Sequence, residues 1–142
     1  MDKKRLSRVL GLDFGERRIG LALSDPLGII AKPLTIIDRK KTADHISRIS
    51  EIVSERKITS IVVGLPLTLK GDYSKQTEIV LAFIDQLKSD LQIPIMTIDE
   101  RLSSVAAKKS LQAQAVKTGH NKSRVDETAA AIFLQEYLDS QS

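Results

Sequence analysis

The chain has 142 residues, a length that suits one domain with its own buried core, and we expect a single domain over residues 1–142. Hydrophobic residues make up 42% and charged residues 28%, which excludes a disordered or fibrous chain. No apolar run approaches the roughly 18 residues that span a bilayer, and the absence of cysteine excludes a disulfide framework, so we expect a cytoplasmic protein that does not bind membranes. The net charge of +4 fits a polyanionic partner.

Three strands are predicted in the first part of the chain. Residues 8–14 and 18–24 are apolar runs of strand length, separated by a short segment that begins with Gly15, as in a hairpin. Residues 29–37 form a third such run. Because Pro33 lacks an N–H donor, this third strand should lie at an edge of the sheet.

The hydrophobic period then changes to that of a helix over residues 42–57, where the apolar positions are Ile46, Ile49, Ile52 and Val53. Residues 58–63 are β-branched and predict a buried parallel strand. After a loop to about Asp72, a second helix should turn an inner face toward the sheet, made of Ile79, Ala82, Phe83 and Leu87.

The last part of the chain predicts a fifth strand over residues 95–98 and two further helices. The first covers residues 103–114 with Ser103 as its N-cap, and the second begins at Ser123 and ends near Leu138. The order predicts an α/β fold: a mixed five-stranded sheet, built from a three-strand meander and then two parallel strands, with helices on both faces.

Carboxylates occur at three places next to apolar strands or on the apolar face of a helix. Asp13 ends an otherwise apolar strand, although a turn-forming aspartate is an equal alternative. Asp99 and Glu100 directly follow the fifth strand, where they could also serve as helix-start acids. Asp126 could simply favour a helix N-terminus, yet its spacing places it on one face with Ala129, Ala130 and Phe133.

Taken together, these acids favour a metal site. Ligands bind an open α/β sheet outside the carboxyl ends of its parallel strands, where Asp13 and Glu100 lie. The first turn of the last helix would bring Asp126 to the same edge if its alanine face packs on the sheet. Converging carboxylates suit Mg²⁺ or Mn²⁺, and one or two ions would fit. Two ions about 4 Å apart can promote phosphodiester hydrolysis.

Basic residues near these acids are candidates for contacts with phosphate, although any single one of them is more often solvated surface: Arg17, Arg18, Lys70, Arg101, Lys117, His120, Lys122 and Arg124. The chain has only two histidines, which are far apart in sequence and predict no histidine metal site. We expect His45 on the surface and His120 as a proton or phosphate contact.

Four motifs closely resemble those of the YqgF family of pre-16S rRNA nucleases, also described as Holliday junction resolvases. They occur in the family's order and extend from Val9 to Tyr137: Gly11-Leu12-Asp13-Phe14-Gly15 with Arg18-Ile19-Gly20 and Ser24-Asp25; Val63-Gly64-Leu65-Pro66; Asp99-Glu100-Arg101-Leu102-Ser103; and Asp126 with Ala129-Ala130. The resemblance implies an RNase H-like fold, a cytoplasmic location, a divalent metal and maturation of ribosomal RNA ends. It places the family's acidic site residues at Asp13, Glu100 and Asp126.

Two departures from related sequences are visible. Many family members carry Asn-Met-Asp-Gly where this chain has Thr68-Leu69-Lys70-Gly71, so Lys70 replaces an acid and the role of the loop from Leu67 to Gly71 is open. Junction resolvases of the same fold have a carboxylate at the end of the fourth strand, where this chain has Gly64-Leu65-Pro66. The second acid must then come from the fifth strand.

Several functions agree with these features. The first is a nuclease that acts on precursor 16S rRNA or, alternatively, on branched DNA as a Holliday junction resolvase. The second is a noncatalytic RNA-binding factor in ribosome assembly. The third is an ATPase of the actin type, but that fold needs two such domains. Whether the protein is a monomer or a homodimer is left open by the sequence.

Overall fold

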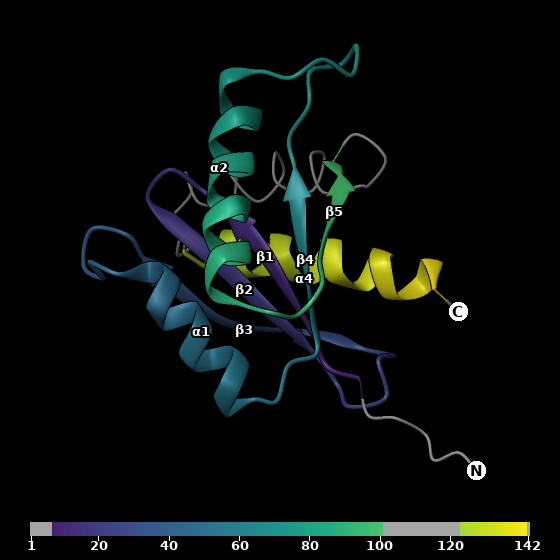
Figure 1. The fold of residues 1–142 in the computed structure, drawn as a ribbon. Coiled ribbons are helices and arrows are strands. Elements are labelled where there is room, and N and C mark those ends of the chain that lie inside the picture. The colour runs from purple at the N-terminus through teal and green to yellow at the C-terminus, as the bar shows by residue number, and fades with distance from the viewer. Residues whose placement is uncertain (1–6, 101–122, 142) are drawn as a thin grey trace.

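The computed structural model describes residues 7–100 and 123–141, and in the second range the side chains from residue 129 onward. Figure 1 shows one sheet with helices packed against it. Within the described part, the strands are β1 (Val9–Phe14), β2 (Arg18–Ser24), β3 (Ala31–Asp38), β4 (Ser60–Leu65) and β5 (Ile95–Asp99). The helices there are α1 (His45–Glu55), α2 (Lys75–Asp90) and α4 (Ser123–Ser140).

The five strands form one mixed sheet in the order β3-β2-β1-β4-β5. β1 pairs antiparallel with β2 and parallel with β4, and β4 pairs parallel with β5. Helices α1 and α2 cover one face of the sheet and α4 crosses the other (Figure 1). The predicted fold class is therefore confirmed, including the three-strand meander and the helices on both faces.

The hairpin and the edge strand agree with the sequence. The amide of Gly15 donates to the carbonyl of Arg18 at 2.9 Å and closes the turn between β1 and β2. β3 lies at the edge of the sheet, as Pro33 predicts, and Pro33 stands opposite Ala22 beside a register shift. An edge position tolerates the missing donor of proline because one side of the strand has no partner strand.

Helix α1 is shorter than its hydrophobic period suggests. It begins at His45 because the side chain of Asp44 caps it, accepting hydrogen bonds from the amide of Ser47 at 3.0 Å and from its hydroxyl at 2.8 Å. The buried residues are Ile49, Ile52 and Val53, as predicted, whereas Ile46 is only partly buried. The following strand, β4, starts and ends two residues later than the predicted range of 58–63.

The inner face of α2 was predicted wrongly in part. Ile79 is 41% exposed and Ala82 is also exposed, whereas the buried residues are Thr77, Val80, Phe83, Ile84 and Leu87. The buried face of α2 can include a threonine because the hydroxyl of Thr77 has hydrogen-bond partners. It bonds to the carbonyl of Pro66 and to the cap residue Ser74. The spacing of apolar residues alone cannot identify a buried polar position of this kind.

Helix α4 packs on the sheet through its small residues, as predicted. Ala129 and Ala130 are fully buried. The helix approaches β1 at Gly11, where a Cβ atom would lie 2.9 Å from Cβ of Leu134 and 3.0 Å from the carbonyl oxygen of Ala130. The predicted helix over residues 103–114, with its Ser103 cap, lies outside the described residues. Among the described helices, none has the length and apolar character needed to cross a membrane.

Candidate active site

The carboxyl ends of three parallel strands meet at one edge of the sheet. Leu12 of β1 pairs with Val63 of β4, which pairs with Thr97 of β5. Asp13 is one residue beyond this row, and Asp99 is the last residue of β5. Figure 1 shows this edge at the arrowheads of β4 and β5. The structure therefore brings Asp13, Asp99 and the following Glu100 to the same edge, as the sequence predicts.

Asp13 is a buried acid on the face that α4 covers. Its side chain is 5% exposed. Side chains alternate along a strand, so Asp13 shares a face with Gly11, which contacts α4. Gly20 stands opposite it on β2. Burying a carboxylate in this way is costly unless hydrogen bonds or cations compensate for the lost water, which fits a metal ligand.

The alternation of side chains along β5 places Asp99 and Asp13 on opposite faces of the sheet. Met96 and Ile98 pack with the residues that contact α4, so Asp99 belongs to the opposite face of the sheet from Asp13. Glu100 follows directly and is half-buried. Because β4 lies between β1 and β5, and neighbouring strands are about 4.8 Å apart, the ends of β1 and β5 are separated by roughly 10 Å. An aspartate and a glutamate side chain would have to reach toward each other across β4.

Helix α4 runs so that its first turn approaches the Asp13 end of β1. Leu138 near its C-terminus packs with Val9 at the start of β1, and Ala130 lies against Gly11. Asp126 is one turn before Ala130, about 6 Å along the helix, and Asp13 is about 6.6 Å beyond Gly11 along the strand. The backbone thus brings residue 126 toward the edge where Asp13 lies.

The side chain of Asp126 is outside the described part. Within the residues that the structure describes, no three histidine or acidic side chains are grouped closely enough to hold a metal ion. The three-acid site of Asp13, Glu100 and Asp126 therefore stays a prediction. Its donors are all carboxylate oxygens, which is the set that Mg²⁺ and Mn²⁺ prefer.

Three of the predicted phosphate contacts can be placed. Arg17 lies in the turn after Asp13, where its guanidinium pairs with the carboxylate of Asp38 at 3.5 Å and remains 48% exposed. The pKa of Asp38 is lowered mainly by the amide of Lys40 and also by Arg17. Arg18 begins β2 and is half-buried. The remaining candidates lie outside the described side chains: Arg101, Lys117, His120, Lys122 and Arg124.

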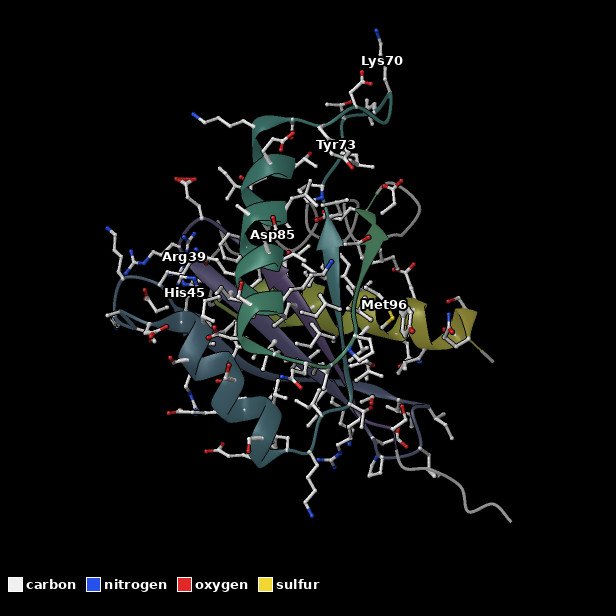
Figure 2. The ribbon with its side chains drawn as sticks, viewed as in Figure 1. Arg39, His45, Lys70, Tyr73, Asp85 and Met96 are labelled. Atoms are coloured by element: carbon white, nitrogen blue, oxygen red, sulfur yellow. The ribbon has the colours of Figure 1, made fainter. Side chains whose placement is uncertain are left out.

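Lys70 is exposed at the tip of the loop between β4 and α2 (Figure 2). Thr68 organises this loop: its amide donates to the carbonyl of Asp72 at 3.0 Å, and its hydroxyl accepts from the amide of Asp72 at 3.0 Å. The amide of Gly71 donates to the carbonyl of Thr68 at 2.8 Å, and Gly71 has a φ of 89° that favours glycine. The loop is thus an ordered turn that presents Lys70 to solvent beyond the carboxyl end of β4 (Figure 2).

Sequence reasoning missed an aromatic cluster behind Asp13. The ring of Phe14 stacks on that of Phe83 with centroids 4.1 Å apart, and the ring of His45 lies 6.2 Å from Phe14. His45 is half-buried here, so the expected surface position is only partly right. Burial lowers the pKa of His45, and the nearby charge of Arg39 adds to this effect. The spacing of these residues in sequence gives no signal for the cluster.

Comparison with known proteins points to one family. The model of the RuvX family, described as Holliday junction resolvase, matches residues 7–140. A protein of Roseiflexus sp. (strain RS-1) is 45% identical over 94% of this chain and 95% of its own length, and one of Desulforamulus reducens is 46% identical over 94% and 97%. Both carry the name "Putative pre-16S rRNA nuclease".

Solved structures show the same fold at low sequence identity. RuvC of Thermus thermophilus in complex with a Holliday junction substrate has a TM-score of 0.59 and 14% identity, covering 95% of each chain. The resolvase of fowlpox virus with Holliday junction DNA has a TM-score of 0.55 and 12% identity, covering 94% of this chain and 98% of its own. The RNase H-like fold is thus confirmed, and the chain belongs to the RuvX family, which the motif resemblance to YqgF proteins predicts.

Proposed function

We propose that this protein is a nuclease that hydrolyses phosphodiester bonds with the help of a divalent metal. The observation that carries the proposal is the buried carboxyl of Asp13, which lies at the carboxyl end of the central strand and on the face that α4 covers. Membership of the RuvX family and the names of the relatives support it. The favoured substrate is the end of precursor 16S rRNA.

Asp13, Glu100 and Asp126 would hold one or two ions of Mg²⁺ or Mn²⁺. The bound metal would supply an activated water and neutralise charge on the leaving oxygen. The predicted basic residues would hold the phosphate backbone at the same edge. Of these, Arg17, Arg18 and Lys70 can be placed in the structure. Nucleic acid is therefore the expected partner, and a single domain over residues 1–142 acting in the cytoplasm is the expected form.

Cleavage of branched DNA is the second candidate. The description of the RuvX family favours it, and the two resolvases with the same fold are seen with Holliday junction DNA. However, β4 ends in Gly64-Leu65-Pro66 without the carboxylate that the sequence comparison leads us to expect there in a junction resolvase. We therefore rank precursor rRNA first.

The test is a cleavage panel of precursor 16S rRNA and four-way DNA junctions, each with and without Mn²⁺. The unmodified protein is compared with Asp13→Asn and Glu100→Gln. Asp85→Asn is a matched control because Asp85 is an exposed acid on the outer side of α2 (Figure 2). We expect the first two variants to lose cleavage and the control to retain it. Cleavage by folded Asp13→Asn would overturn the proposal, and RNA binding without turnover would favour a noncatalytic assembly factor.

A further inference from the structure

Arg39 binds the turn that follows Asp13. It comes directly after β3, and its backbone amide donates to the carbonyl of Arg17 at 2.7 Å. Its Nη1 atom donates to the carbonyl of Gly15 at 3.0 Å and to that of Glu16 at 2.7 Å. One residue thus donates to three successive carbonyls of the turn between β1 and β2. Hydrogen bonds from a charged donor are stronger than those between neutral groups.

The side chain of Arg39 also packs against an aromatic ring of the core. The guanidinium of Arg39 lies over the ring of Phe14, 4.5 Å from its centroid. Phe14 in turn stacks on Phe83 of α2, which is 3% exposed. Figure 2 shows Arg39 beside His45 at this end of the molecule. The turn is therefore connected through Arg39 and Phe14 to the core under α2.

The turn needs such support because its backbone is tight and carries a glycine. A Cβ atom on Gly15 would lie 2.6 Å from the carbonyl oxygen of Arg18, so no side chain fits there. Glycine gives the chain more freedom than any other residue. Metal ligands, by contrast, must be held within about 0.5 Å of their working geometry. Asp13 is only two residues before Gly15, so disorder of the turn would reach it directly.

We propose that Arg39 is a positioning residue, which fixes the turn after β1 and thereby sets the affinity of the Asp13 site for a divalent metal. The inference rests on the proposed nuclease function. Arg39 acts on the face of Phe14, whereas Asp13 faces α4 on the other side of the sheet. Arg39 therefore lies away from the metal-facing side of Asp13 and would act on it through the backbone of the turn. A lysine keeps the positive charge, but its compact ammonium cannot lie flat over the ring of Phe14 and donate to both carbonyls as the planar guanidinium does.

The experiment titrates Mn²⁺ into the full chain by calorimetry and also measures the Mn²⁺ midpoint and the maximal rate of cleavage. The variants are Arg39→Ala and Arg39→Lys. Arg48→Ala is the matched control, because Arg48 is an arginine on α1 that is 44% exposed and pairs only with Glu51 and Glu55 among the described residues. Amide hydrogen exchange at Gly15 reports on the turn itself, since this amide donates to Arg18.

We expect Arg39→Ala to speed exchange at Gly15 and to weaken Mn²⁺ binding by up to about 10-fold. Removing a group that bonds a metal ligand directly costs about 10-fold or more, and Arg39 supports Asp13 only through the backbone. Arg39→Lys should fall between this variant and the unmodified protein, and it serves as the test if the alanine variant fails to fold. Arg48→Ala should bind Mn²⁺ normally. Unchanged Mn²⁺ affinity in folded Arg39 variants would overturn the inference.

The two proposals fail in different ways. A protein that binds Mn²⁺ but cleaves no nucleic acid would overturn the nuclease, and the titration would still decide the role of Arg39. Faster exchange at Gly15 with normal Mn²⁺ affinity would show a purely structural contact and overturn the positioning role. An unmodified protein that binds no Mn²⁺ would overturn both.

Discussion

The ring of Phe133 lies against the backbone of Gly64, in the space that a side chain on residue 64 would occupy. Phe133 is fully buried on α4 and also packs with Ile98 of β5. Gly64 is the next to last residue of β4, between the strand that carries Asp13 and the strand that precedes Glu100. The contact therefore sets how closely α4 approaches the edge of the sheet where the predicted acids lie.

Replacing Gly64 with alanine should destabilise the fold. The added methyl group overlaps the ring of Phe133, which is itself fully buried. Overpacking of this kind typically costs about 1–3 kcal/mol of unfolding free energy. Urea denaturation of Gly64→Ala measures the loss.

The double variant Gly64→Ala with Phe133→Leu tests the cause. Leucine leaves space beside residue 64, so the penalty of Gly64→Ala should be smaller in the Phe133→Leu background than in the unmodified protein. A double-mutant cycle gives the coupling energy between the two sites. Fully additive losses would show that the ring is not what excludes a side chain at residue 64.

Removing the carboxylate of Asp13 should abolish stabilisation by metal without harming the fold. Mn²⁺ at 100 times its dissociation constant would stabilise the unmodified protein by about 2.7 kcal/mol through mass action. Asp13→Asn should show no such rise in Tm. Thermal unfolding with and without Mn²⁺ measures the shift, and a full metal-induced shift in Asp13→Asn would contradict the site.

The sequence predicts those features that depend on the type of a residue. It does not predict the role of a side chain whose hydrogen-bond partner is a main-chain carbonyl. Pro33 gives the edge strand because a missing donor is a property of proline, and Asp13 stands out because its neighbours are apolar. Thr77 was missed on the inner face of α2, where its hydroxyl is satisfied by a main-chain carbonyl. Arg39 was missed for the same reason, since its partners are carbonyls that any residue could supply.

The pH dependence of stability should contain a contribution from His45. Burial lowers its pKa below 6.5, and Arg39 adds to this effect while Asp44 opposes it. The unfolded chain therefore binds a proton more readily than the folded one, so stability is lost as pH falls from 6.5 through the folded pKa. Between pH 7 and 5 the unmodified protein should lose more stability than His45→Gln. Unfolding free energies at several pH values measure this, and parallel profiles would contradict it.

Arg39→Gln should raise the pKa of His45, because the variant removes the nearby positive charge. Titration of the His45 ring signals by NMR measures the shift directly. Asp44, whose negative charge raises the pKa of His45, is unchanged in this variant, so its effect on the pKa remains. A pKa of His45 that is the same in both proteins would show that burial alone lowers it.

Lys70 should contribute to nucleic-acid binding through charge alone. It is exposed at the tip of an ordered loop that extends beyond the carboxyl end of β4, so its charge is open to a phosphate in solvent. Lys70→Ala should weaken binding equally for all sequences and reduce the slope of log K against log salt by about 1. Lys88→Ala is the matched control, since Lys88 lies in the last turn of α2, at the other end of the helix. Binding is measured over a salt series in the Asp13→Asn background to prevent cleavage. An equal loss in both lysine variants would indicate an effect of net charge and not a contact at this loop.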